Sequence, residues 1–297
     1  MKWRGRRQSS NIDDRRGMRG GGGRGGGMNP LMLFSLVRML FSKKGLIILG
    51  ILAVVMYFAG INPLSLIGLD GDPSTNLSSQ PYEASPGEQQ LAEFSAVVLA
   101  DTENVWNELI EGYREPTLVL FSGTVSSACG GASSASGPFY CPADEKLYID
   151  LSFFADMEKQ LGAPGDFAQA YVIAHEVGHH IQKLMGTTDK VQSLRGKISD
   201  KEYNEYSVRL ELQADFLAGV WAHHTQRMHQ TLESGDMEEA LQTASAIGDD
   251  RLQKQSTGRV VPDAFTHGTS AQRVRWFKKG YETGDLTQGD TFGATDL

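Results

Sequence analysis

The chain contains only two cysteines, Cys129 and Cys141, among its 297 residues. That number excludes a disulfide-rich miniprotein, and it excludes a zinc or iron–sulfur site built from four cysteines. Hydrophobic residues make up 40% of the chain and charged residues 22%, which excludes a fully disordered or collagen-like protein. The chain is long enough to bury at least one sizeable core, in one or two domains.

Basic residues are scarce after the first 44 positions. Residues 1–44 carry eleven Lys/Arg against two Asp, a net charge of +9, whereas residues 45–297 carry 17 against 34, a net charge of −17. This split favours two compartments or two partners over one uniformly charged surface. The first thirty residues include the run RGGGGRGGG and cannot bury enough apolar area to fold. Residues 1–44 are therefore predicted to form a disordered head with a short interfacial segment at 31–41.

Charged residues are absent from Gly45 to Leu69. As a helix, these 25 residues are long enough to cross a hydrocarbon core of about 30 Å. A transmembrane anchor in the lipid bilayer is favoured over a cleaved signal peptide, whose charged first region would have to exceed forty residues. The positive-inside rule then places the N-terminus in the cytoplasm and residues 70–297 outside it. Arg/Gly-rich tracts can bind nucleic acid, but beside an anchor the head is better interpreted as a topology signal, so no nucleic-acid partner is expected.

Residues 70–87 are rich in Pro, Ser and Gly and form a predicted linker to a folded domain at 88–297. Helical spacing of apolar residues predicts a helix within 88–113, and two β-branched and aromatic runs predict strands at 117–121 and 146–151. Capping signals predict four further helices, which begin near Asp166, Ser199, Asp236 and Thr269. The pattern predicts an α+β domain that is mostly helical with a small β-sheet.

His175 and His179 belong to an H-E-x-x-H motif, HEVGH, within the helix predicted to begin near Asp166. A spacing of four residues places both imidazoles on one helix face, where they can share a zinc ion. Glu176 lies beside them and can reach a water held by the metal. The alternative is a pair of structural histidines. It is disfavoured because the motif occurs by chance in only about one of a hundred such sequences.

A catalytic zinc needs a third protein ligand and an open position. The candidate is Glu211, thirty-two residues after His179 on the next predicted helix. Asp215 lies one turn further along, where it would accept the outer N–H of a zinc-bound histidine. Asp215 as ligand in place of Glu211 is the main alternative. A metzincin site is excluded, because Gln182 and Met185 occupy the positions of its glycine and third histidine.

His267 precedes the last predicted helix in a turn bounded by glycine. A histidine in such a loop could stabilise the oxyanion of a tetrahedral intermediate, or it could be an ordinary surface residue. His180 is expected to point elsewhere on its helix and to bind no metal. The histidines near the end of the second long helix are expected to be exposed; they are His223, His224 and His229.

Cys129 and Cys141 are twelve residues apart in a loop-rich segment between the two predicted strands. Outside the cytoplasm such a pair would be oxidised to a disulfide, and two free buried thiols are the alternative. The stretch GPFY at 137–140 could form a substrate-facing edge, to which an extended peptide adds as a strand.

Several stretches of the chain together resemble the bacterial neutral zinc metallopeptidases, a family of membrane-anchored proteins of the zincin group. The resemblance is carried by MKWRGRRQSSNIDDRRG, SACGGASSASGPFYCPADEKLYIDLSFF, HEVGHHIQ, the stretch around ELQAD, and THGTSAQR. It implies a bacterial cell-membrane protein with one span and a zincin-like, zinc-dependent peptidase domain. Together with the positive-inside rule, this predicts that the domain lies in the periplasm. It also implies that His175 and His179 bind zinc and that Glu176 is catalytic, with Glu211 as the third ligand and Asp215 behind a histidine.

The sequence thus predicts a membrane-anchored zinc peptidase with one Zn²⁺ per chain, expected to be an endopeptidase. Glu176 would act as general base on a zinc-activated water, and the substrate would be a peptide or a protein. The alternative is a zincin domain that binds zinc or a partner protein without cleaving peptides.

Overall fold

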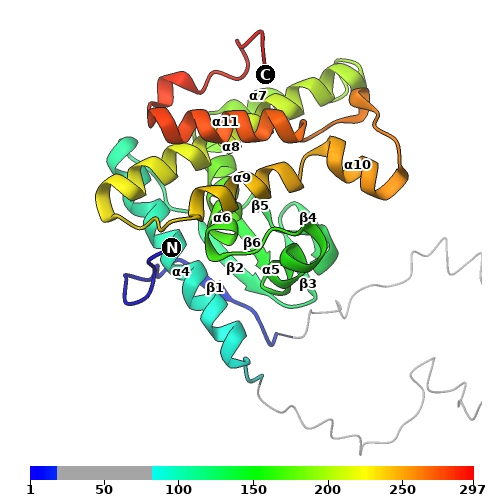
Figure 1. Cartoon of the computed structure of the whole chain (residues 1–297). Coiled ribbons are helices and arrows are strands. Elements are labelled where there is room, and N and C mark those ends of the chain that lie inside the picture. Colours follow the sequence, from blue (N-terminus) through cyan, green and yellow to red (C-terminus); the bar gives the residue numbers. More distant parts are fainter. Residues whose placement is uncertain (19–81) are drawn as a thin grey trace, which may run out of the picture. The chain divides into compact units, whose positions relative to one another are not determined.

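A computed structural model describes residues 1–18 and 82–297 of the chain (Figure 1). The predicted anchor at 45–69, the interfacial segment at 31–41 and most of the linker at 70–87 lie outside the described residues. Within the two described stretches, no helix is both long and apolar enough to cross a bilayer. Both stretches belong to one folded unit.

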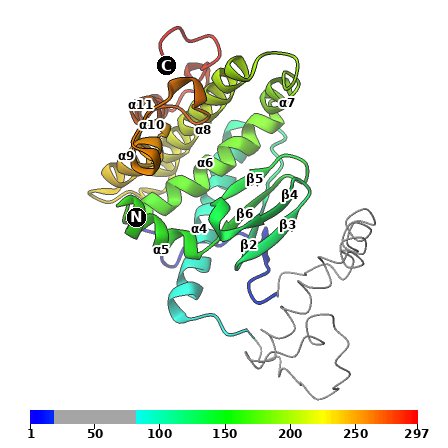
Figure 2. The ribbon, with the colours of Figure 1, turned by 90° about the vertical axis from the view of Figure 1, so that its right-hand side faces the viewer.

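The main sheet contains four strands in the order β1-β2-β6-β5. Three strands run parallel: β1 (Ile12–Asp14), β2 (Thr117–Phe121) and β6 (Lys146–Asp150). The fourth, β5 (Phe139–Cys141), pairs antiparallel with β6 at the other edge. A separate hairpin joins β3 (Thr124–Ser127) to β4 (Gly130–Ser133). The two strands predicted from sequence are β2 and β6, and they are neighbours in the sheet (Figure 2).

Side chains of the central strands alternate between two apolar clusters. Leu118 and Leu120 of β2 face the main core, which the helices complete. Val119 and Phe121 face a smaller cluster that includes Val125 of the hairpin. This alternation is the period of two that strand geometry requires. Because both faces of β2 are buried, its sequence TLVLF is a continuous apolar run and not a polar and apolar alternation.

Helices make up most of the remaining described chain. The longer ones are α4 (Pro86–Leu109), α6 (Asp166–Leu184), α8 (Asp200–His229), α9 (Asp236–Ala246), α10 (Asp249–Thr257) and α11 (Ser270–Thr283). Shorter elements are α5 (Ser152–Asp156), a π-helical turn at Met157–Leu161, α7 (Thr187–Gln192), and 3-10 turns at Ser134–Ser136, Pro262–Ala264 and Leu286–Gln288. The predicted mostly helical chain with a small sheet is therefore present, whereas α10 lacks apolar periodicity and was not predicted.

Two of the four predicted helix starts carry the predicted caps. The capping boxes at Ser199 and Thr269 begin α8 and α11. The predicted caps Asp166 and Asp236 are wrong, since glycines occupy both N-cap positions. Asp166 and Asp236 are instead the first residues of α6 and α9, where a carboxylate stabilises the positive end of the helix dipole. Both carboxylates bind the Met1 ammonium, at 2.5 Å and 3.3 Å.

The first eighteen residues are part of the folded unit, so the prediction of a disordered head is wrong for them. The side chains of Met1, Trp3 and Ile12 pack against the main core. The guanidinium groups of Arg6 and Arg7 pair with carboxylates of α4. The prediction averaged composition over thirty residues, whereas the glycine run begins only at position 20. The apolar partners of this segment are far away in sequence, so no local pattern indicates them.

Glycines allow the helices that carry the functional residues to approach closely. α11 lies along α8 (Figure 1), and Gly219 and Gly280 each lie against the backbone of the opposite helix. α6 crosses α8 at Gly178, where an added Cβ would lie 3.0 Å from the carbonyl oxygen of Ala214. A side chain at Gly178 would push α6 away from α8. The glycine of HEVGH therefore sets the distance between the two helices at the metal centre.

Candidate metal centre

His175 and His179 lie one turn apart on α6, and their ring centroids are 4.8 Å apart. α6 is buried along most of its length, because the sheet side and the α8 side both cover it. His175 is 6% exposed and Glu176 is 8% exposed. A helix buried in this way holds its polar side chains in fixed rotamers, which is what a metal site requires.

Glu211 of α8 completes a cluster of three possible metal ligands. Its carboxylate lies 3.2 Å from Nε2 of His175 and 3.4 Å from Nε2 of His179. All three ligand atoms lie within 4.8 Å of one another. In a zinc tetrahedron with bonds of roughly 2.0 Å, neighbouring ligand atoms are about 3.3 Å apart. The residues therefore fit zinc in donor type and spacing, and the cluster contains Glu211 and not Asp215, which was the alternative ligand.

Asp215 lies behind His175 and binds its outer ring nitrogen. The distance from Oδ1 of Asp215 to Nδ1 of His175 is 2.9 Å. The same carboxylate accepts two hydrogen bonds from Arg273 of α11, at 2.8 Å and 2.9 Å, and one from the Tyr171 hydroxyl at 2.5 Å. Asp215 is fully buried and Arg273 is 2% exposed. This arrangement fixes the His175 tautomer with Nε2 free to bind metal.

His179 is held by an amide and not by a charged group. Its Nδ1 lies 2.9 Å from Oε1 of Gln182. The Gln182 amide nitrogen donates to the Leu210 carbonyl oxygen at 2.6 Å and to the Gln213 side chain at 3.1 Å. The Gln213 amide in turn donates to the Gly289 carbonyl oxygen at 3.1 Å. His179 is therefore oriented by a neutral chain of hydrogen bonds that runs from α6 through α8 to the C-terminal segment.

The charges of the cluster favour a divalent cation. Burial raises the pKa of a carboxyl group, yet His179 and His175 hold the pKa of Glu211 well below its usual range. Arg273 and His175 likewise lower the pKa of the buried Asp215. Burial alone would lower the pKa of His175, but the Asp215 carboxylate outweighs it and raises the pKa to about 10. A proton and a metal ion therefore compete for His175 in the metal-free chain.

The three candidate ligands line a cleft of about 500 Å³ that is also lined by Glu176 and His267. One wall comes from the edge strand β5 and the residues before it, including Phe139 and Tyr140. Apolar side chains of four helices and of the residue that follows α9 also line the cleft; they are Phe153, Val172, Leu210, Leu252 and Ile247. A cleft of this size beside a metal site can admit a segment of a peptide.

His267 lies in the loop before α11 and is paired with Asp249 at the start of α10. The distance from Nδ1 of His267 to Oδ1 of Asp249 is 3.2 Å. The other carboxylate oxygen accepts the backbone N–H groups of Thr266 and His267, at 2.7 Å and 2.6 Å. The hydrogen bond to Asp249 raises the pKa of His267, whose side chain is 51% exposed. The structure thus places His267 at the cleft with a carboxylate partner that the sequence analysis did not find.

The remaining histidines lie away from the cluster. His180 is fully buried and bonds to the Arg114 carbonyl oxygen and the Tyr140 hydroxyl. The prediction of exposure is wrong for His224, which is 8% exposed and bonds to the Gly284 carbonyl oxygen. His223 is partly buried and bonds to the Tyr281 carbonyl oxygen. Both contacts arise because α11 and its C-cap lie against the end of α8, which sequence periodicity could not indicate.

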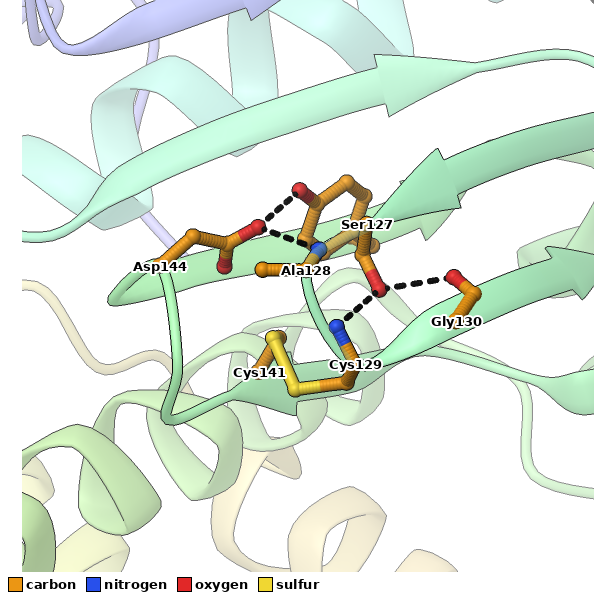
Figure 3. Close-up of a disulfide and its surroundings, with 7 residues drawn as sticks. Ser127, Ala128, Cys129, Gly130, Cys141 and Asp144 are labelled. Atoms are coloured by element: carbon orange, nitrogen blue, oxygen red, sulfur yellow. Dashed lines mark hydrogen bonds between the residues drawn. A yellow bond between two sulfur atoms is a disulfide. The ribbon is translucent and has the colours of Figure 1, made fainter.

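Cys129 and Cys141 form a disulfide between the β3–β4 turn and the end of β5 (Figure 3). Cys129 is exposed and Cys141 is fully buried. The turn is also held by Asp144, which accepts the Ala128 N–H at 3.0 Å. The disulfide therefore fixes the hairpin to the strand that forms one wall of the cleft.

Arg273, Gln182, Tyr171 and Asp249 support the site, and the sequence analysis assigned a role to none of them. Arg273 is the last residue of the stretch THGTSAQR, and Gln182 is the last residue of HEVGHHIQ. Their positions at the ends of two motifs are the signal that could have found them. Tyr171 lies one turn before His175 on α6 and so shares its face, whereas Asp249 carries no local signal.

The site is thus a cluster of two histidines and one glutamate, in an H-E-x-x-H helix at the wall of a cleft, as expected of a zinc metallopeptidase. Residues 1–292 match the family described as "Putative neutral zinc metallopeptidase", and the chain belongs to this family. It is 49% identical over 297 residues to the uncharacterised protein YpfJ of Escherichia coli K12, covering 99% of both chains. It is 46% identical over 204 residues to the uncharacterised protein Rv2575 of Mycobacterium tuberculosis H37Rv, covering 65% of this chain and 68% of the relative. No solved structure matches the chain.

Proposed function

We propose that the protein is a zinc-dependent peptidase that hydrolyses peptide bonds. The observation that carries this proposal is the position of Glu176, which follows His175 on α6 and lines the same cleft as the three ligand candidates. A structural zinc site is closed by four protein ligands, whereas a catalytic site has three and keeps one position open. Three ligands beside a cleft and an adjacent carboxylate correspond to the catalytic case.

His175, His179 and Glu211 would hold the metal. When bound, zinc would supply a Lewis acid that polarises both a water molecule and the scissile carbonyl group. Glu176 accepts the proton of the attacking water and passes it to the leaving amine.

His267 is proposed to stabilise the negative charge that develops on the carbonyl oxygen of the substrate. Its Nδ1 is engaged with Asp249, and the raised pKa favours the imidazolium form. In that form Nε2 also carries a proton and can donate a hydrogen bond. A preorganised donor of this kind acts on the transition state more than on the bound substrate.

A peptide or protein in extended conformation is the proposed substrate. β5 is an edge strand of the sheet, and its residues Phe139 and Tyr140 line the cleft. An edge strand can pair with an added strand through backbone hydrogen bonds. Because such pairing requires no chain terminus, we propose that cleavage is internal and that the enzyme is an endopeptidase.

The test compares full-length wild-type protein with Glu176→Gln and with Glu205→Gln, an exposed glutamate on α8 that serves as the control. We measure zinc content and the cleavage of a broad fluorogenic peptide library. We expect one zinc per chain in all three proteins, and a loss of cleavage by about 10² to 10⁴ in Glu176→Gln alone. Cleavage by Glu176→Gln at the wild-type rate would contradict the mechanism. Bound zinc without cleavage in any of the proteins would favour the non-catalytic scaffold.

A further inference from the structure

The N-terminal residues are built into the main sheet of the folded unit that also carries the candidate metal centre. β1 pairs in parallel register with β2, with Ile12 opposite Leu118 and Asp14 opposite Leu120. The backbone of Asn11 accepts the N–H of Leu118 at 2.9 Å, and the N–H of Arg15 donates to the Leu120 carbonyl oxygen at 2.7 Å. The pairing thus extends beyond both ends of β1, and β1 is a full member of the sheet.

Ionic contacts and packing fix the rest of this segment to α4. Arg6 pairs with Asp101, and Arg7 pairs with Glu103 at 2.9 Å. Asp101 and Glu103 are only 2% and 1% exposed, so both carboxylates depend on these partners. Trp3 also packs edge-on against Phe94, a core residue of α4. Breaking these contacts would leave buried carboxylates unpaired, which is strongly unfavourable.

The chain leaves this unit at residue 18 and returns to it at residue 82, and the two points are adjacent. The Arg16 guanidinium donates to the Glu88 carbonyl oxygen at 3.2 Å and lies 3.8 Å from the Glu88 carboxylate. Gly17 lies directly against the Tyr82 side chain, with no room for a Cβ. The residues on either side of the 19–81 stretch therefore meet on one surface of the folded unit.

We propose that residues 1–18 and the metal centre lie on the same side of the membrane that the uncharged stretch at 45–69 contacts. A strand cannot pair with a sheet across a hydrocarbon layer of about 30 Å. Residues 1–18 and residues 82–297 must therefore lie on one side of the bilayer. Contact between residues 45–69 and the bilayer is retained. A single crossing, which would place the N-terminus in the cytoplasm and the folded domain in the periplasm, is replaced by an arrangement with both on one side.

The basic residues that supported a single crossing have a different role in the structure. Six of the eleven basic residues of positions 1–44 lie in the described stretch 1–18, and four of these six form ion pairs there; they are Arg6, Arg7, Arg15 and Arg16. Basic residues in the loops that flank a span act as orientation signals. The four arginines fold together with the domain that follows residues 45–69. They therefore give no evidence that the N-terminus lies on the other side of the membrane from that domain. The proposal is independent of peptidase activity.

The experiment places single cysteines in the full-length protein at Ser10, which is exposed in the N-terminal segment, and at Ser256, which is exposed on α10. Cells that express Ser10→Cys or Ser256→Cys are treated with a membrane-impermeant maleimide, before and after permeabilisation. The wild-type protein gives the background, because its two cysteines are joined in a disulfide. Both substitutions are at the surface, so neither disturbs the core.

We expect both variants to react under the same condition, with labelling that agrees within about twofold. Gln8→Cys, a second exposed position of the N-terminal segment, should follow Ser10→Cys and so exclude a local effect. Labelling of Ser256→Cys in intact cells together with protection of both N-terminal positions until permeabilisation would overturn the proposal. Labelling of both N-terminal positions in intact cells, with protection of Ser256→Cys until permeabilisation, would also overturn the proposal.

Discussion

The two histidines of HEVGH are supported in different ways. Behind His175 lies the carboxylate of Asp215, which is itself paired with the guanidinium of Arg273. Behind His179 lies the neutral amide of Gln182, which continues to the backbone of α8. Both supports fix a ring nitrogen, but one is a buried ion pair and the other is a chain of neutral hydrogen bonds.

The two supports differ in how much folding free energy is lost when one partner is removed. A buried ion pair that loses one partner leaves an uncompensated charge in a medium of low dielectric constant. A broken amide chain leaves only neutral groups unsatisfied, each at a smaller cost. We infer that the His175 side of the site couples metal binding to the stability of the whole fold, because Asp215 and Arg273 join α8 to α11. The His179 side orients a ligand with less effect on stability.

The largest expected effect is that of Asp215→Ala. This change leaves Arg273 buried without its carboxylate and removes the acceptor for His175, so we expect a loss of about 3–5 kcal/mol in the free energy of unfolding. Urea denaturation of the metal-free, full-length protein measures it. Zinc affinity, measured by competition with a chelator, should also fall about 10- to 100-fold.

A double variant shows how much of the loss in Asp215→Ala comes from the unpaired charge of Arg273. Asp215→Ala with Arg273→Leu removes both buried charges and should be more stable than Asp215→Ala alone. The control is Arg275→Gln on the same helix as Arg273, which breaks an exposed pair with Asp296 of the C-terminal segment and should change stability by less than about 1 kcal/mol. The single variants Asp215→Ala and Arg273→Leu complete the comparison. If the double variant lost as much stability as the two single variants together, Asp215 and Arg273 would not be coupled.

A smaller effect is expected for Gln182→Leu, which breaks the neutral support of His179. It leaves Nδ1 of His179 and the Leu210 carbonyl oxygen without their partner, so we expect a loss of about 1–3 kcal/mol. Gln182→Glu is the matched variant, since it restores an acceptor for His179 but not the donor to Leu210. It should therefore keep zinc affinity better than Gln182→Leu does. A stability loss for Gln182→Leu as large as that for Asp215→Ala would refute the distinction between the two supports.

The candidate ligands could be predicted from sequence because their spacing is local. His175 and His179 lie one turn apart on one helix with Glu176 beside them, and Glu211 and Asp215 lie one turn apart on the next long helix, so periodicity alone places each pair on one face. Their supports could be predicted less well, because Arg273 reaches Asp215 across 58 positions of the chain.

The N-terminal segment shows the same limit. Its partners on α4 and β2 are about a hundred residues away, and composition alone predicted disorder. The fold class was predictable from the helical periods and the two central strands, whereas the parallel addition of β1 was not. Pairings between distant segments depend on the complete packing, and no short stretch of sequence encodes them.

The smallest expected effect concerns a second histidine supported by a carboxylate, His267 with Asp249, which repeats the chemistry of His175 with Asp215 at a half-exposed position. Because the pKa of His267 is raised in the folded state, its contribution to stability is full below its ordinary pKa of 6.5 and is lost as the pH rises through the raised value. Because the pKa of Asp249 is lowered, its contribution is lost as the pH falls below its ordinary 3.8.

His267→Gln should therefore destabilise the protein between about pH 4 and pH 6.5, by less than about 1 kcal/mol because the His267 side chain is half exposed, and the effect should vanish in alkaline solution. Thermal unfolding of wild type and variant across this pH range measures it. His229→Gln is the control of opposite sign, since partial burial and Arg6 lower the pKa of His229. If the His267→Gln effect instead grew with rising pH, the raised pKa and the role of His267 as an imidazolium donor would both be wrong.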